Sequence, residues 1–173
     1  MTRTEFGFER TTCACNVCVL NCRVMPGYLI PADLERIIPP YVDSFLWAQE
    51  NLLASPGALV MNSQTGRTFR IGTLVPAIKA DGGGCINLTK DGRCKIHQIA
   101  PFGCSFFDCG PEPPGLALEG VCAVQDAQRD PLSRYARIWA HLYHMGRVQE
   151  RAEVLRERMR KELNYAGTTH TIE

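Results

Sequence analysis

The feature that most constrains this chain is a cysteine-rich segment at residues 82–109, GGGCINLTKDGRCKIHQIAPFGCSFFDC. Four cysteines lie within it: Cys85, Cys94, Cys104 and Cys109. A second group of four lies near the N-terminus: Cys13, Cys15, Cys18 and Cys22. Close grouping at short spacings is typical of metal ligands, whereas a thiol buried in a core needs no neighbouring cysteine. The sequence therefore predicts metal binding by these eight residues.

The composition favours reduced thiols over disulfides. The chain has 173 residues, enough to bury a hydrophobic core without cross-links, and its nine cysteines are an odd number. The first residues, MTRTEFGFERTTC, lack the apolar stretch of a secretory signal, so we expect a cytoplasmic protein. No apolar run approaches the ~18 residues of a membrane span, and a net charge of +1 argues against binding to nucleic acid or acidic membranes.

The spacing in the N-terminal group indicates which thiols share a site. Cys15 and Cys18 form a C-x2-C pair, which zinc and iron–sulfur sites commonly use. Cys18 and Cys22 are four residues apart and would share one face of a helix. In an extended chain Cys13 and Cys15 would point to opposite sides, so Cys13 is the weakest candidate ligand of the group.

The surroundings of the second group fit the charge of a thiolate site. Glycines allow close backbone approach and supply N–H donors, here Gly84, Gly92, Gly103 and Gly110. Cations nearby would offset the negative charge: Lys90, Arg93 and Lys95. We expect a small hairpin to carry Cys85 and Cys94 on its two arms. His97 is predicted to support the site rather than to ligate, because cysteines already fill the ligand positions.

The remaining sequence predicts ordinary scaffold. Proline and acidic residues favour a short helix over residues 31–38, and a second helix is expected over 42–54. Apolar residues on both sides of the Asn62–Gly66 turn predict a hairpin. Cys122 is isolated, and we interpret it as a buried core cysteine. From Asp130, apolar residues recur at steps of three and four, which predicts one long amphipathic helix that Gly146 would bend.

These elements predict an α+β fold, a small irregular metal-stabilised domain with short strands and helices plus a long C-terminal amphipathic helix. We assign residues 1–129 to a cysteine-cluster metal-binding domain, 130–165 to a C-terminal helical extension and 166–173 to a flexible tail.

Several residues give the chain a resemblance to a known family. They are Cys85, Leu88, Asp91-Gly92-Arg93-Cys94, Ile96-His97, Pro101, Cys104, Phe106 and Cys109. The helix motif P-A-D-L-E-R-I at residues 31–37 adds to them. With these motifs the chain resembles the YkgJ-like cysteine-cluster family of zinc- or iron-chelating domains. It departs from the family pattern in lacking an adjacent cysteine pair in the first group and in having Ala100 where an arginine precedes the proline. A related cysteine region in flagellin-lysine methylases resembles an iron–sulfur site, which tilts the resemblance toward iron.

Three classes of function follow. The first is a protein holding an iron–sulfur cluster, with 4Fe–4S favoured by the uneven spacings, or zinc, for electron transfer, cluster handling or redox sensing. The second is a zinc-stabilised interaction module whose C-terminal helix docks on a protein partner. The third is a metal-dependent modifying enzyme, for which the sequence offers no phosphate loop, nucleophile elbow or H-E-x-x-H motif. No catalytic residue is assigned.

Overall fold

A computed structural model describes residues 4–8, 15–61, 65–106 and 113–165 of the chain. Within these ranges there are seven α-helices and a short 3-10 helix, η1 (His97–Ile99). The helices are α1 (Asn16–Val24), α2 (Pro31–Ile37), α3 (Ser44–Asn51), α4 (Phe102–Ser105), α5 (Leu116–Arg129), α6 (Arg134–His144) and α7 (Ala152–Tyr165). The strands are β1 (Leu52–Ser55), β2 (Leu59–Met61), β3 (Thr68–Arg70) and β4 (Thr73–Pro76). The predicted α+β class is confirmed.

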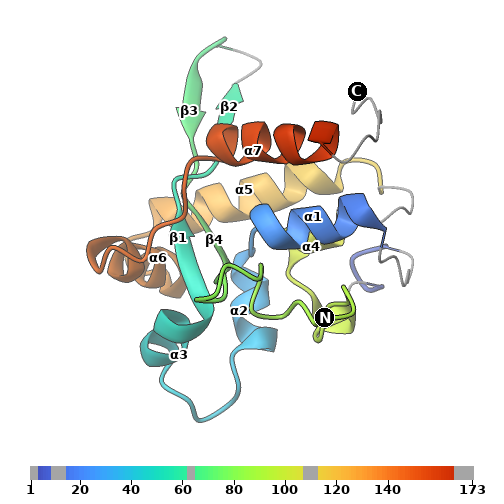
Figure 1. Cartoon of the computed structure of the whole chain (residues 1–173). Helices are drawn as coiled ribbons and strands as arrows, with labels where there is room; N and C mark the ends of the chain where they lie inside the picture. Colours follow the sequence, from blue (N-terminus) through green and yellow to red (C-terminus); the bar gives the residue numbers. More distant parts are fainter. Residues whose placement is uncertain (1–3, 9–14, 62–64, 107–112, 166–173) are drawn as a thin grey trace.

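The strands form two small antiparallel sheets. β1 pairs with β4, with Leu53 opposite Val75, and β2 pairs with β3 as a hairpin that projects from the body (Figure 1). The hairpin lies where the sequence predicts one, although residues 62–64 of its turn lie outside the described residues. The helix predicted over 42–54 is shorter. It ends at Asn51, because the next four residues pair with β4 instead.

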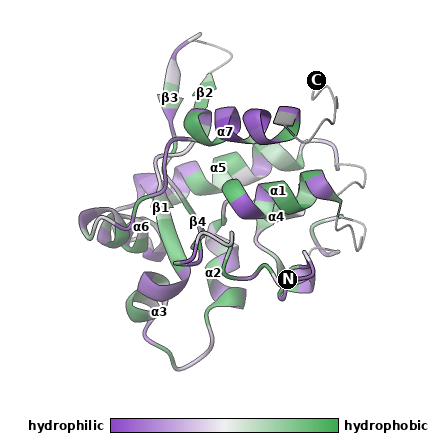
Figure 2. Cartoon of the chain, in the orientation of Figure 1, coloured by the Kyte–Doolittle hydropathy of each residue, from purple (hydrophilic) through white to green (hydrophobic). Residues whose placement is uncertain are grey.

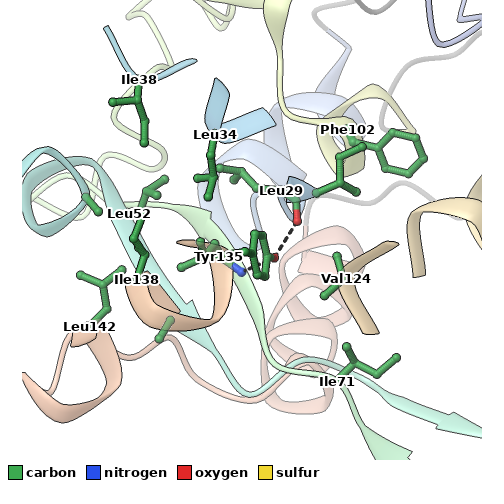
Figure 3. Close-up of a cluster of buried hydrophobic side chains, with 14 residues drawn as sticks. Leu29, Leu34, Ile38, Leu52, Ile71, Phe102, Val124, Tyr135, Ile138 and Leu142 are labelled. Atoms are coloured by element: carbon green, nitrogen blue, oxygen red, sulfur yellow. Dashed lines mark hydrogen bonds between the residues drawn. The ribbon is translucent and has the colours of Figure 1, made fainter. Parts of the chain in front are cut away.

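The main core lies between α2, α5, α6 and the β1–β4 sheet. Tyr135 stands at its centre, fully buried, and its hydroxyl donates to the Leu29 carbonyl at 2.7 Å and accepts from the Leu74 N–H at 2.9 Å (Figure 3). Ile138 and Leu142, one and two turns further along α6, are also fully buried. Residues 134–144, which the sequence assigns to an extension, thus contribute to the same core as α2 and β4.

A second apolar cluster joins the two ends of the chain. Leu155, Met159 and Leu163 of α7 pack against Leu20 and Val24 of α1, and the two helices lie side by side (Figure 1). The apolar stripe of α7 is therefore covered by the helix that carries the first cysteines. Most other residues of α7 are hydrophilic in colour (Figure 2).

The predicted single C-terminal helix is in fact two helices. α6 ends at His144, and Gly146 adopts a left-handed backbone with φ of +72°. The chain then runs extended past β1, where the Ala54 N–H donates to the Arg147 carbonyl and the Gln149 N–H to the Ala54 carbonyl. This backbone pairing is a long-range contact that periodicity does not reveal. The tail at 166–173 lies outside the described residues, which contain no helix long and apolar enough to cross a membrane.

Candidate metal centre

Helix α1 positions the cysteines of the N-terminal group. Cys15 is its N-cap residue and is exposed, whereas Cys18 is buried in its first turn. Their Sγ atoms are 3.4 Å apart, far beyond the length of a disulfide bond. Cys22 lies one turn after Cys18, so both thiols share a face, as the four-residue spacing predicts. Cys13 lies outside the described residues.

The segment that carries Cys85 lies directly on the end of α1. The Cys85 N–H donates to the Cys22 carbonyl at 2.7 Å. Gly84, with φ of +88°, lies so close to α1 that a Cβ atom there would be 2.8 Å from the Arg23 Cα. A side chain at this position would clash with α1. Gly84 therefore allows the segment that carries Cys85 to lie against the helix that carries Cys18 and Cys22.

Cys94 returns along a short hairpin. Leu88 and Cys94 form an antiparallel bridge, and the Thr89 N–H donates to the Arg93 carbonyl at 2.8 Å. Gly92 has φ of +78° in the turn, and a Cβ there would lie 3.2 Å from Val19 of α1. The predicted hairpin with a thiol on each arm is therefore present.

Cys104 is held by a contact between two glycines. A Cβ on Gly27 would lie 2.2 Å from the Cys104 nitrogen, and one on Gly103 would lie 2.4 Å from the Tyr28 nitrogen. The Gly103 N–H donates to the Tyr28 carbonyl at 2.8 Å, and the Cys104 Sγ lies 3.6 Å from the Gly27 carbonyl. Any side chain at either glycine would push α4, and the thiol that it carries, away from the rest of the site.

A buried ion pair fixes the loop before Cys104. Asp33 is fully buried, and its carboxylate accepts the Phe102 N–H at 2.8 Å and the Ile30 N–H at 2.9 Å. Arg36 donates to the same carboxylate and to the Ala100 carbonyl. Burial raises the pKa of Asp33, while Arg36 and the N–H donors act against that rise. The D-L-E-R motif thus ties α2 to residues 100–102.

Together these contacts direct five cysteines toward one cavity of about 50 Å³. They come from three separate parts of the chain: Cys18, Cys22, Cys85, Cys94 and Cys104. His97 also lines this space, as do Pro26 and Pro101. Described members of both cysteine groups therefore line one cavity.

The thiols influence one another electrostatically. Burial raises the pKa of Cys104 well above its ordinary value, and the negative charge of Cys85, Cys22 and Cys94 raises it further. Burial likewise raises the pKa of Cys85 to about 11, with Cys94 adding to the effect and the Asn87 N–H and Lys79 opposing it. In the metal-free protein these two groups are therefore protonated near neutral pH.

The environment of the sulfurs differs from the sequence expectation. The Gly92 and Gly103 N–H groups donate to the Thr89 and Tyr28 carbonyls rather than to sulfur, and Gly110 lies outside the described residues. The Asn87 N–H lies 3.4 Å from Cys85 Sγ, and the Leu88 N–H also acts on this thiol.

The expected cations lie at the surface. Lys90, Arg93 and Lys95 are exposed, and Arg93 pairs with Asp91 at 3.5 Å. The lysine that acts on Cys85 is Lys79, whose Nζ donates to the Leu88 carbonyl. Sequence reasoning missed Lys79 because it precedes the cysteine-rich segment of residues 82–109. Only the tertiary structure brings it near Cys85.

Two further cysteines that the structure describes, Cys15 and Cys122, do not line this cavity. Cys122 is exposed on α5, so the prediction of a buried core cysteine is wrong. Gly120 and Val124 occupy the buried face of that helix instead. Cys15 contacts Cys18 but does not line the cavity, and Cys109 lies outside the described residues.

The seven cysteines in the described part of the chain form no disulfide with one another. In the same part, no group of three or more histidine, cysteine or acidic side chains is already arranged to hold a metal ion. Five thiols therefore line one cavity, but their described positions do not form a complete set of metal ligands.

Exposure predicts how these thiols react. In the metal-depleted protein at pH 8, we expect iodoacetamide to modify Cys122 and Cys15 at least about tenfold faster than Cys85, since alkylation needs an accessible thiolate and Cys85 is buried with a pKa of about 11. Peptide mass spectrometry at timed intervals measures the rates. Equal rates at Cys85 and Cys122 would contradict the burial described here.

Comparison with known proteins adds no relative. No protein-family model matches the chain, and neither a curated protein nor a solved structure matches it. The relationship to the YkgJ-like family therefore stays a prediction, and the site is interpreted from its own geometry.

Proposed function

We propose that this chain is a metal-binding protein that holds an iron–sulfur cluster, or zinc, through the cysteines around the α1 cavity. The observation that carries the proposal is the convergence of Cys18 and Cys22, Cys85 and Cys94, and Cys104 from three segments onto one small space. Free thiols gain nothing from such grouping, because their charges repel when they ionise. A bound cation reverses that repulsion and stabilises the thiolates.

The donor set and the room available favour an iron–sulfur cluster. Soft thiolate ligands suit both zinc and iron–sulfur clusters, but a cluster must also be accommodated between its ligands. The cavity of about 50 Å³ exceeds the ~10–15 Å³ that one water needs, so there is space beyond that of a single ion. Such a cluster would give the protein a role in electron transfer, cluster handling or redox sensing.

The surrounding residues supply what a thiolate site requires. Binding removes the thiol protons, and the resulting charge is offset by the Asn87 N–H, which is directed at Cys85 Sγ, and by the positive charge of Lys79 nearby. Since free thiolate chemistry requires reduced cysteines, a cytoplasmic location belongs to the same proposal.

One contact favours zinc as the second candidate. The Sγ atoms of Cys15 and Cys18 are 3.4 Å apart, near the separation of about 3.8 Å that two ligands of a tetrahedral zinc with Zn–S bonds of about 2.3 Å would have. Zinc would then serve to hold α1 against the 84–104 segment. The interaction-module alternative gains less support, because α1 already covers Leu155, Met159 and Leu163 on the C-terminal helix.

Metal analysis of protein purified with and without oxygen tests the proposal. We expect anaerobic protein to be brown, to absorb near ~400 nm, to bleach with dithionite and to contain iron and sulfide in equal amounts. Colourless protein with stoichiometric zinc would select the second candidate. Protein that binds neither metal, in either preparation and after reconstitution, would refute the proposal.

A further inference from the structure

A second and larger cavity lies on the other side of the Pro26–Gly27 segment. Its volume is about 350 Å³, within the range of small-molecule sites. Apolar residues from the β-strands, α5 and α7 form most of its wall, among them Val60, Ile71, Val75, Val121 and Ala152. Pro26 borders both this cavity and the cysteine-lined one.

One buried amide in this wall lacks a partner. Gln149 lines the cavity with only 8% of its surface exposed, and its Nε2 atom finds no hydrogen-bond partner in the described structure. Its backbone is fixed, because the Gln149 N–H donates to the Ala54 carbonyl at 2.8 Å. A buried donor without an acceptor destabilises a fold, so its presence beside an apolar cavity points to an acceptor supplied by a ligand.

A cation stands at the same cavity. Arg156 of α7 is exposed, lines the cavity and forms no ion pair with the residues that the structure describes. Its neighbours on the helix differ: Arg158 pairs with Glu150, and Arg160 with Glu157 at 3.3 Å. Arg156 is thus placed to meet an anionic group that enters the cavity.

From these observations we propose that the cavity binds a small monocarboxylic acid with an apolar body. The apolar wall takes the hydrocarbon part, while one carboxylate oxygen accepts from Gln149 Nε2 and the other faces the Arg156 guanidinium. The site does not depend on the metal proposal, because none of the cysteines that the structure describes lines it.

Titration calorimetry of the full chain with decanoate, below its micellar concentration, tests this site. Saturable one-to-one binding is expected, tighter than that of hexanoate by about fourfold per added methylene until the cavity is filled. Decanol, which offers no carboxylate, should bind at least about tenfold more weakly.

Four variants locate the binding. Gln149→Leu and Arg156→Gln should each weaken decanoate at least about tenfold, and Ala117→Trp, a change at an exposed position of the wall, should abolish binding by filling the space. Arg160→Gln, on the same helix but away from the cavity, should bind as the parent does. Gln149→Leu should also raise the urea midpoint of unfolding, because it removes the unpaired donor.

The proposal is overturned if decanoate does not bind, if decanol binds as tightly, or if binding survives Ala117→Trp. It is also overturned if Arg156→Gln, whose exposed position leaves folding intact, matches Arg160→Gln in affinity. A lower urea midpoint in Gln149→Leu would show that the amide serves the fold rather than a ligand.

Discussion

Replacing Cys104 with serine is expected to lower the metal content of the purified protein at least about tenfold. Its thiol lines the cavity and is influenced electrostatically by Cys22, Cys85 and Cys94. Loss of a supporting hydrogen bond alone costs about 10–100-fold in metal affinity, and loss of a ligand should cost more. Metal per chain, measured by mass spectrometry after anaerobic purification, gives the result.

Cys122→Ser is the matched control, since Cys122 is exposed on α5 and distant from the cavity lining. It should keep the full metal content, and its melting temperature should respond to chelator as the parent's does. Cys104→Ser should instead melt at the temperature of the chelated parent, because structural metal binding contributes to folding free energy. Equal metal content in the two variants would rule out the five-thiol centre.

The local parts of this site could be predicted from the sequence. A four-residue spacing places Cys18 and Cys22 on one helix face, and the turn at Asp91–Gly92 pairs Leu88 with Cys94. How the thiols of the two groups divide among sites could not be predicted, because it depends on backbone contacts between distant segments. Gly84 against Arg23 is one such contact.

The misjudged elements share a physical cause. Leu52–Ser55 has ordinary helical propensity but becomes a strand because β4 offers it backbone partners. Cys122 lies among apolar residues, yet only Gly120 and Val124 face the core, and the choice of face depends on where α5 packs. Tertiary contacts decided both outcomes, and local sequence patterns do not predict these contacts.

The second large effect is expected at Asp33. Asp33→Ala should lower the free energy of unfolding by about 3–5 kcal/mol, because it removes the fully buried carboxylate that is paired with the Arg36 guanidinium. It also removes the acceptor for the Ile30 and Phe102 N–H groups. Against a typical total of about 5–15 kcal/mol, such a loss is large. Urea denaturation of the metal-depleted protein, followed by circular dichroism, measures it.

Glu35→Ala supplies the control on the same helix. Glu35 is exposed and pairs with Arg134 at 3.0 Å, a surface contact that contributes about 0–1 kcal/mol. Similar losses in the two variants would show that the Asp33–Arg36 pair does not hold the structure. If the pair does hold residues 100–102, Asp33→Ala should weaken metal binding as well, since Phe102 begins the helix that carries Cys104. Glu35→Ala should leave metal binding unchanged. Comparison of the two variants therefore distinguishes loss of the contact that holds residues 100–102 from a general loss of stability of α2.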